Sequence, residues 1–156
     1  MVENRWSEVE NRPKSGPLQP TNPKRESNDE VIFTATDLGQ AGETGSSAYG
    51  VNDNGWIVGE SEDAVGFTPI RWEDDGFGGF MRVALAAEGT ALAVNDNDRS
   101  AGWSGALGVA TVWDAATPPA AATLFGTASQ AYSLNNDLQP LVVGRNGATG
   151  FIKRAN

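Results

Sequence analysis

Three short runs of asparagine and aspartate hold the side chains of this sequence that could do chemistry. They are residues 52–54, 95–98 and 135–137, and each stands between two apolar segments. Carboxylate and amide oxygens are the ligands that Ca²⁺ prefers, so these runs could hold calcium. No run, however, has three alternating acidic ligands followed by a distant glutamate. We therefore interpret the runs as structural turns, because turn chemistry alone accounts for their residues.

Acid–base chemistry would need a different site, for which the carboxylates Glu73, Asp74 and Asp75 are the candidates. A pair of carboxylates can hydrolyse a glycosidic bond when the two groups flank it. Consecutive residues at a strand end point to opposite faces, so a charged turn is a sufficient explanation. The chain has no histidine and no cysteine, which removes histidine-based triads, thiolate nucleophiles and the common zinc sites. We expect a non-catalytic protein without a cofactor.

Four aromatic residues are the candidates for ligand or interface contacts: Trp56, Trp103, Tyr49 and Tyr132. Aromatic faces beside asparagine and aspartate side chains suit the binding of sugars. The two tyrosines hold the same place in their segments, and packing is the simpler explanation for them.

An internal repeat supplies the elements that position these residues. An apolar segment ending in asparagine is followed by a turn and by a second apolar segment ending in glycine, three times in the chain. The lead residues are Asn52, Asn95 and Asn135, and the closing residues are Gly59, Gly102 and Gly144. The asparagines are 43 and 40 residues apart, and the glycines 43 and 42. A fixed period of this size is typical of repeat architectures.

Period-2 alternation, with glycine, asparagine and aspartate between the segments, predicts an all-β chain beyond residue 30. In the first repeat, 47–86, the expected strands are 47–52, 56–61, 66–73 and 80–85. In the second, 90–126, they are 90–95, 99–104, 109–114 and 121–125. In the third, 130–154, they are 130–135, 141–145 and 149–153. The third repeat therefore lacks a last strand, and we expect the β-branched segment 31–39 to complete it.

Each turn has residues suited to its backbone. The first asparagine is expected to bond to backbone N–H groups beyond it, as an Asx turn. Gly55 supplies a positive φ, and Asp98, which replaces it in the second repeat, tolerates that conformation better than most residues. A glycine that closes a strand marks a close backbone approach or a bend. Trp72 and Trp113 share one strand position, where Lys153 stands in the third repeat, and we interpret the tryptophans as spacers packed between units.

The repeat resembles the HAF repeat, also described as an extracellular repeat. The pattern Ala-x-x-Val-Asn-x-x-Gly-x-x-Val-Gly, then a tryptophan strand and a Leu-Gly element, covers about residues 31–154. The matching residues are Ala48, Val51, Asn52, Gly55, Val58, Gly59, Trp72, Ala91, Val94, Asn95, Gly102, Trp113, Ala131, Leu134, Asn135, Val143 and Gly144, with the preceding Asp37, Leu38 and Gly39. The chain departs from the pattern at Asp98, at a two-residue insertion between Asn135 and Gly144, and at Lys153. The resemblance implies four-stranded propeller blades and an extracellular or surface location, and it implies no catalytic residues.

Three blades are too few to close a ring, since propellers usually have 4–8. We expect closure by oligomerisation, with a dimer forming a ring of six blades. A β-trefoil, which closes at three units, is the alternative.

Residues 1–30 contain four prolines and many polar side chains, which predicts an extended arm separate from the β domain at 31–156. The formal charge of −9 opposes binding to nucleic acid or to an anionic membrane, and no segment is apolar enough to insert into a membrane or to act as a signal peptide. We expect a module for protein interaction or structural assembly, tethered by the arm, such as a subunit or decoration protein of a virion or cell surface. The alternative is a multivalent carbohydrate-binding module.

Overall fold

The structure, a computed structural model, describes residues 35–155. The chain divides into Met1–Ala35 and Thr36–Asn156, close to the predicted boundary, and everything below concerns the second unit. The arm predicted at 1–30 lies outside the described residues. None of residues 35–155 belongs to a helix that could span a membrane.

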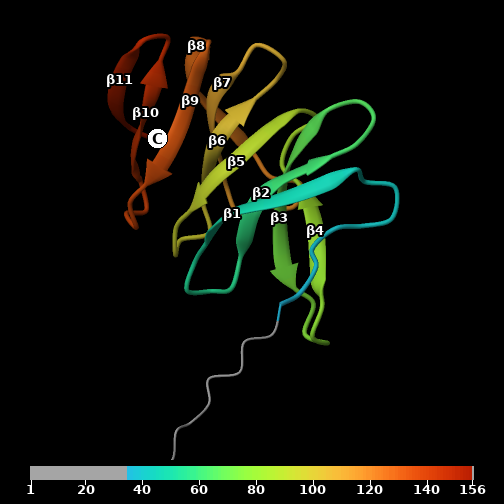
Figure 1. The fold of residues 1–156 in the computed structure, drawn as a ribbon. Coiled ribbons are helices and arrows are strands. Elements are labelled where there is room, and N and C mark those ends of the chain that lie inside the picture. The colour runs from blue at the N-terminus through green and yellow to red at the C-terminus, as the bar shows by residue number, and fades with distance from the viewer. Residues whose placement is uncertain (1–34, 156) are drawn as a thin grey trace, which may run out of the picture. The chain divides into compact units, whose positions relative to one another are not determined.

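Eleven strands form three antiparallel sheets, one for each repeat, which confirms the all-β prediction (Figure 1). The first sheet contains β1 (Gly45–Val51), β2 (Ile57–Glu62), β3 (Phe67–Asp74) and β4 (Phe80–Ala84). The second contains β5 (Gly89–Val94), β6 (Ser100–Ser104), β7 (Val109–Trp113) and β8 (Ala121–Thr127). The third contains β9 (Ser129–Leu134), β10 (Leu141–Asn146) and β11 (Thr149–Arg154). Strands pair in chain order within each sheet, so every sheet is a simple meander.

The three sheets follow one another in chain order, with the first and the third on opposite sides of the second (Figure 1). The first strand of each later sheet lies against the sheet before it: β5 contacts β1, β2 and β3, and β9 contacts β5, β6 and β7. No sheet closes into a barrel, and each consists of strands from a single repeat. The trefoil alternative, which needs strands of all three repeats in one barrel, is therefore wrong for the described residues.

The third sheet has three strands, and the segment 31–39, which was expected to add a fourth, does not do so in its described part. Residues 31–34 lie outside the described residues, and 35–39 form no strand. The Leu38 carbonyl instead accepts a hydrogen bond from Trp72 Nε1 of the first sheet, at 3.2 Å. Nearby, Glu43 lies 3.1 Å from the Arg82 guanidinium of the same sheet. In this structure, residues 38–43 therefore contact the first repeat rather than the third.

The core consists of two apolar layers, one between each pair of neighbouring sheets. Between the first and second sheets lie Val58, Leu85, Ala91 and Trp113. Between the second and third lie Ala101, Ala110, Val112, Leu124, Ala131, Val142 and Ala155. Trp113 is fully buried in the first layer, which confirms the predicted packing role of this position. The burial of these side chains is what holds the sheets together.

Candidate functional site

The side-chain oxygen of each lead asparagine accepts hydrogen bonds from its own turn, as the Asx-turn interpretation predicted. The donors to Asn52, Asn95 and Asn135 include the backbone N–H groups of Trp56 at 2.8 Å, Arg99 at 2.9 Å and Leu141 at 2.8 Å. Gly55 and Asp98 have φ angles of 79° and 58°, so aspartate does take the left-handed position of the missing glycine. Each turn is thereby fixed by one amide, which is buried at Asn52 and Asn95 and exposed at Asn135.

The closing glycines are required by a close approach of two backbones. A Cβ at Gly59 would lie 1.8 Å from the Ser47 carbonyl oxygen, and a Cβ at Gly102 would lie 2.0 Å from the Thr90 oxygen. The approach recurs at Gly144. Each lies opposite a β-bulge in the first strand of its sheet, at the point where the pairing register shifts. The prediction of a close approach at these glycines is confirmed.

The nitrogen of each of the first two lead asparagines connects its repeat to the following one. Asn52 Nδ2 donates to the Asn95 carbonyl oxygen at 2.9 Å, and Asn95 Nδ2 donates to the Asn135 carbonyl oxygen at 2.8 Å. One amide therefore satisfies its own turn through oxygen and the neighbouring turn through nitrogen. We call this series of bonds the asparagine ladder.

The second and third residues of the turns add parallel rungs to the asparagine ladder. The backbone N–H of Asp53 donates to Asp96 Oδ1 at 3.0 Å, and that of Asp96 donates to Asn136 Oδ1 at 3.1 Å. The side chains of Asn54 and Asn97 donate in the same way to the carbonyl oxygens of Asp96 and Asn136. In these four bonds the donor lies in the earlier repeat and the acceptor in the later one, so they share a direction. One further bond runs the other way, from Asn136 Nδ2 to the Asp96 carboxylate.

The ladder ends at the third repeat, where its donors turn back. Asn135 Nδ2 donates to Asp137 Oδ2 of its own turn at 3.0 Å. Asp137 stands where Asn54 and Asn97 stand in the earlier repeats, and a carboxylate cannot donate. Asp137 also lies 3.7 Å from the Arg154 guanidinium.

A buried arginine bonds the first two sheets to each other. Arg71 is fully buried, pairs with Glu73 at 2.6 Å and donates to the Asp114 carbonyl oxygen at 3.2 Å. Its guanidinium lies 4.0 Å from the centre of the Trp56 ring. A buried charge requires such partners, and these come from both sheets.

In the first and third repeats, the residue at the tryptophan position donates a hydrogen bond to a leucine carbonyl that precedes the repeat. Trp72 Nε1 donates to the Leu38 carbonyl oxygen, and in the third repeat Lys153 Nζ donates to the Leu124 carbonyl oxygen at 2.6 Å. In the second repeat Leu85 packs against Trp113, and Trp113 Nε1 has no hydrogen-bond partner within residues 35–155. Lys153 thus makes the hydrogen bond that the tryptophan makes in the first repeat. Leu38 holds the place, relative to the first repeat, that Leu124 holds relative to the third.

The four aromatic candidates are not brought together. Trp56 is half-buried under Arg71. Trp103 is half-buried beside Gln130 and Arg145, at a depression of about 240 Å³ between the second and third repeats. Tyr49 and Tyr132, on the first and third sheets, are about half exposed, at 49% and 46%.

Tyr49 belongs to a short chain of bonds between the first two sheets. Its hydroxyl donates to Glu60 Oε1 at 2.8 Å, and Glu60 Oε2 accepts a bond from the Thr90 hydroxyl of the second sheet. The bond to the Glu60 carboxylate raises the pKa of Tyr49 above its usual 10.0, and burial raises it further.

The three carboxylates considered for acid–base chemistry each have a partner in a turn or an ion pair. Glu73 pairs with Arg71, Asp74 accepts a bond from the Gly76 N–H, and Asp75 accepts one from the Gly79 N–H. Across residues 35–155, no group of three or more carboxylates converges in a way that could hold a metal ion.

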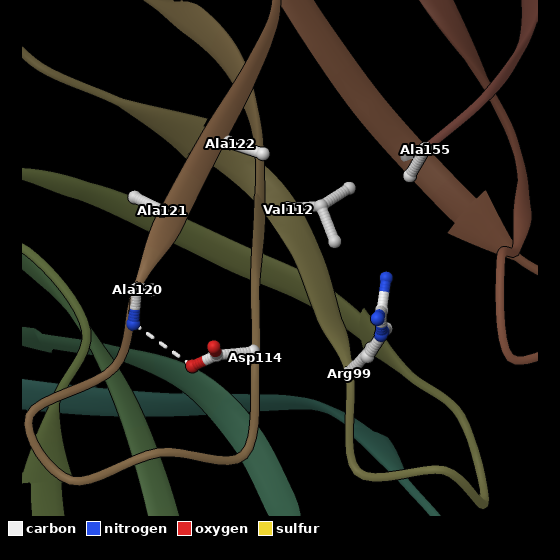
Figure 2. Close-up of a pocket in the computed structure, with 7 residues that line it drawn as sticks. All are labelled: Arg99, Val112, Asp114, Ala120, Ala121, Ala122 and Ala155. Atoms are coloured by element: carbon white, nitrogen blue, oxygen red, sulfur yellow. Dashed lines mark hydrogen bonds between the residues drawn. The ribbon is translucent and has the colours of Figure 1, made fainter.

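A cavity of about 160 Å³ lies between the second and third sheets (Figure 2). It is lined by Arg99, Val112, Asp114, Ala120, Ala121, Ala122 and Ala155. Asp114 is engaged by its own loop, whose Ala120 N–H donates to it at 2.8 Å. Val112 holds the repeat position that Arg71 fills with a longer side chain at the other junction. The cavity is therefore a packing gap rather than a chemical site.

The sequence predicted a series with too few blades to close, but it did not identify the residues on the two outer faces of the series. The side of the first sheet turned away from the second exposes Ala48 and Val51, and we call it the head face. Ala91 and Ala131, the repeat equivalents of Ala48, are fully buried against the preceding sheet.

The side of the third sheet turned away from the second exposes Val143 and Ile152, and we call it the tail face. These two residues are paired in register on β10 and β11 and are 41% and 67% exposed. Their equivalents in the first repeat are Val58 and Arg71, and in the second Ala101 and Val112, all at most 3% exposed. An alignment of the three repeats could have indicated that the third repeat has apolar residues at these two positions, although no further sheet covers them.

No protein-family model, curated protein or solved structure matches this chain. The resemblance to the HAF repeat therefore stays a prediction carried by the motif residues alone.

Proposed function

We propose that this chain is a non-catalytic interaction module, and that its head and tail faces bind protein. The observation that carries the proposal is the exposure of Val143 and Ile152 at positions where both earlier repeats bury their residues between sheets. Exposed apolar surface of this kind is typical of interaction sites.

The proposal agrees with the chemistry of the remaining residues. The chain lacks histidine and cysteine, and the carboxylates at 73–75 are bonded within their own turn and strand. A subunit or decoration protein of a larger assembly, tethered by residues 1–30, is the form of this function that the composition predicts.

A photo-reactive amino acid at Ile152 tests this function. The full chain with this substitution, irradiated in an extract of its source cells, should give one discrete protein adduct, which excess wild-type chain suppresses and excess Ile152→Asp chain does not. Val65, which is 96% exposed in a turn, is the matched control position and should give no such adduct. The proposal fails if Ile152 gives no discrete adduct, or if Val65 gives the same one.

Carbohydrate binding is the second candidate, favoured by the depression beside Trp103. An indole ring next to Gln130 and Arg145 offers an apolar face with polar neighbours, and about 240 Å³ is small for a ligand pocket, as suits one sugar unit. A glycan array probed with the wild-type chain should then show hits that the Trp103→Ala variant loses. An array without hits above background would remove this function.

A further inference from the structure

We infer that the partner of both faces is a second copy of this chain, and that copies join head to tail, with the tail face of one against the head face of the next. The inference rests on the proposed function and names its partner. It follows from four properties of the two ends. The apolar contacts and the hydrogen bonds of the turns match those at the two junctions inside the chain, and strand number and charge are the other two properties.

The first property is apolar complementarity. At both internal junctions, a Val or Ala of the earlier sheet lies against an Ala of the later one: Val58 and Ala91 share one layer, and Ala101 and Ala131 the other. The tail face offers Val143 for the first role, and the head face offers Ala48 for the second. A junction between copies would therefore bury Val143 of one copy against Ala48 of the next, as the internal junctions bury their equivalents.

The second property is the direction of the asparagine ladder. The lead asparagine amides and the backbone N–H groups of the second turn residues all donate from the earlier repeat to the later one, and the Asn136 side chain donates the other way, to Asp96. The tail end retains donors, namely Asn135 Nδ2 and the Asn136 N–H, and the head end retains acceptors, namely the Asn52 carbonyl and the Asp53 carboxylate. Within residues 35–155, the Asn136 N–H and the Asp53 carboxylate have no hydrogen-bond partner. A tail against a head would bring the Asn136 N–H to the Asp53 carboxylate, as the Asp53 N–H meets Asp96 and the Asp96 N–H meets Asn136 inside the chain.

The third property is a matched deficiency in strands. Among residues 35–155, the third sheet has three strands and no counterpart of β4 and β8. The head end carries Leu38 in the place of a preceding repeat's final leucine, bonded to Trp72. A three-stranded sheet docked on the head face would therefore lie beside a leucine that already holds this place.

The fourth property is charge. Apart from Glu60 and Lys153, which bond to the second sheet, residues 36–62 contain four carboxylates and no lysine or arginine, whereas residues 129–155 contain two arginines and one carboxylate. Opposite charges favour a tail against a head, and like charges oppose two heads or two tails. The contact is therefore heterologous rather than isologous.

Single cysteines test this arrangement, because the chain has none of its own. Asp53, Asp96 and Asn136 are the consecutive second positions of the asparagine ladder, and each bonds to the following one. The Asp53→Cys/Asp96→Cys double variant should form a disulfide within one chain, which calibrates the geometry. An Asp53→Cys chain mixed with an Asn136→Cys chain should form a disulfide-linked heterodimer under mild oxidation.

The expected result is a cross-link in the mixture and at most a few per cent in either variant alone. Adding Ile152→Asp to the Asn136→Cys chain should abolish the cross-link, whereas adding Val65→Asp should not; circular dichroism checks that both chains fold. No mixed cross-link, or homodimers of one variant at equal yield, would overturn the inference. If the Ile152 photo-adduct contains a different protein and no mixed cross-link forms, self-association fails while the interaction function stands.

Discussion

Replacing Asn95 by alanine should destabilise the protein more than any other single change in the turns. The Asn95 side chain donates to the Asn135 carbonyl at 2.8 Å and accepts from the N–H groups of Asn97 at 3.1 Å and Arg99 at 2.9 Å. The residue is only 3% exposed, so water cannot replace these bonds. A typical intramolecular hydrogen bond contributes about 0.5–1.5 kcal/mol, and a group left unpaired costs more. We expect a loss of about 2–4 kcal/mol.

Urea unfolding, followed by tryptophan fluorescence, measures this loss. For a domain with a free energy of unfolding of about 5–15 kcal/mol, the midpoint should fall by about 1–2 M. Asn54→Ala is the matched control, because its amide bonds to the Asp96 carbonyl and the Asp98 carboxylate are exposed to solvent. That variant should lose less than about 1 kcal/mol. Equal losses for the two variants would refute the argument that the buried amide holds the turns together.

Asn95→Asp separates the two roles of this amide. The variant keeps the oxygen that accepts bonds from the turn. It replaces the Nδ2 donor with a second carboxylate oxygen, which then faces the Asn135 carbonyl oxygen. Burial and that carbonyl should raise the pKa of the introduced carboxyl above its unfolded value. The protonated form, which can donate, is then favoured in the folded state, so stability relative to wild type should decline as the pH rises from about 4 to 7. A relative stability that does not change with pH would contradict the assignment of the donor.

Three further outcomes follow from the structure. Gly102→Ala should lose about 2–4 kcal/mol in urea unfolding, because its Cβ would lie 2.0 Å from a carbonyl oxygen, whereas Gly126→Ala, with open space around it, should lose less than about 1 kcal/mol. Arg71→Val should lower stability by about 3 kcal/mol by the same assay, since it strips a half-buried carboxylate and two loop carbonyls of their donor. Because the pKa of Tyr49 is raised in the folded state, stability should fall as the pH rises above about 10, and Tyr49→Phe should flatten that part of the urea-midpoint profile.

Much of the fold could be predicted because the residues that build it act locally. Alternating apolar residues placed the strands to within a few residues, and the first asparagine of each run indicated its own turn. Asp98 was correctly expected to replace a glycine, because the left-handed conformation depends on that residue alone. The close approaches at Gly59 and Gly102 were predicted for the same local reason.

The asparagine ladder could not be predicted because it depends on the distance between turns that are about 40 residues apart. The repeat period shows that the turns are equivalent, yet it does not place one turn above another. The signal was nonetheless present: the second position of each run, Asp53, Asp96 or Asn136, always offers an acceptor side chain. The bond from Lys153 to Leu124 was missed because a lysine in a tryptophan position looks like a lost contact until the carbonyl beside it is known.

The asymmetry of the core layers has a consequence for how the molecule opens. The second sheet is covered on both sides, whereas the first and third sheets each share one layer with a neighbour. In a series of units that contact only their neighbours, an outer unit can detach by breaking one interface, but the central unit must break two. Amide hydrogens of β6 should therefore exchange with solvent by global unfolding, and those of β10 by local detachment of the third sheet. Protection would decline from the centre of the series toward its ends unless another molecule covers them.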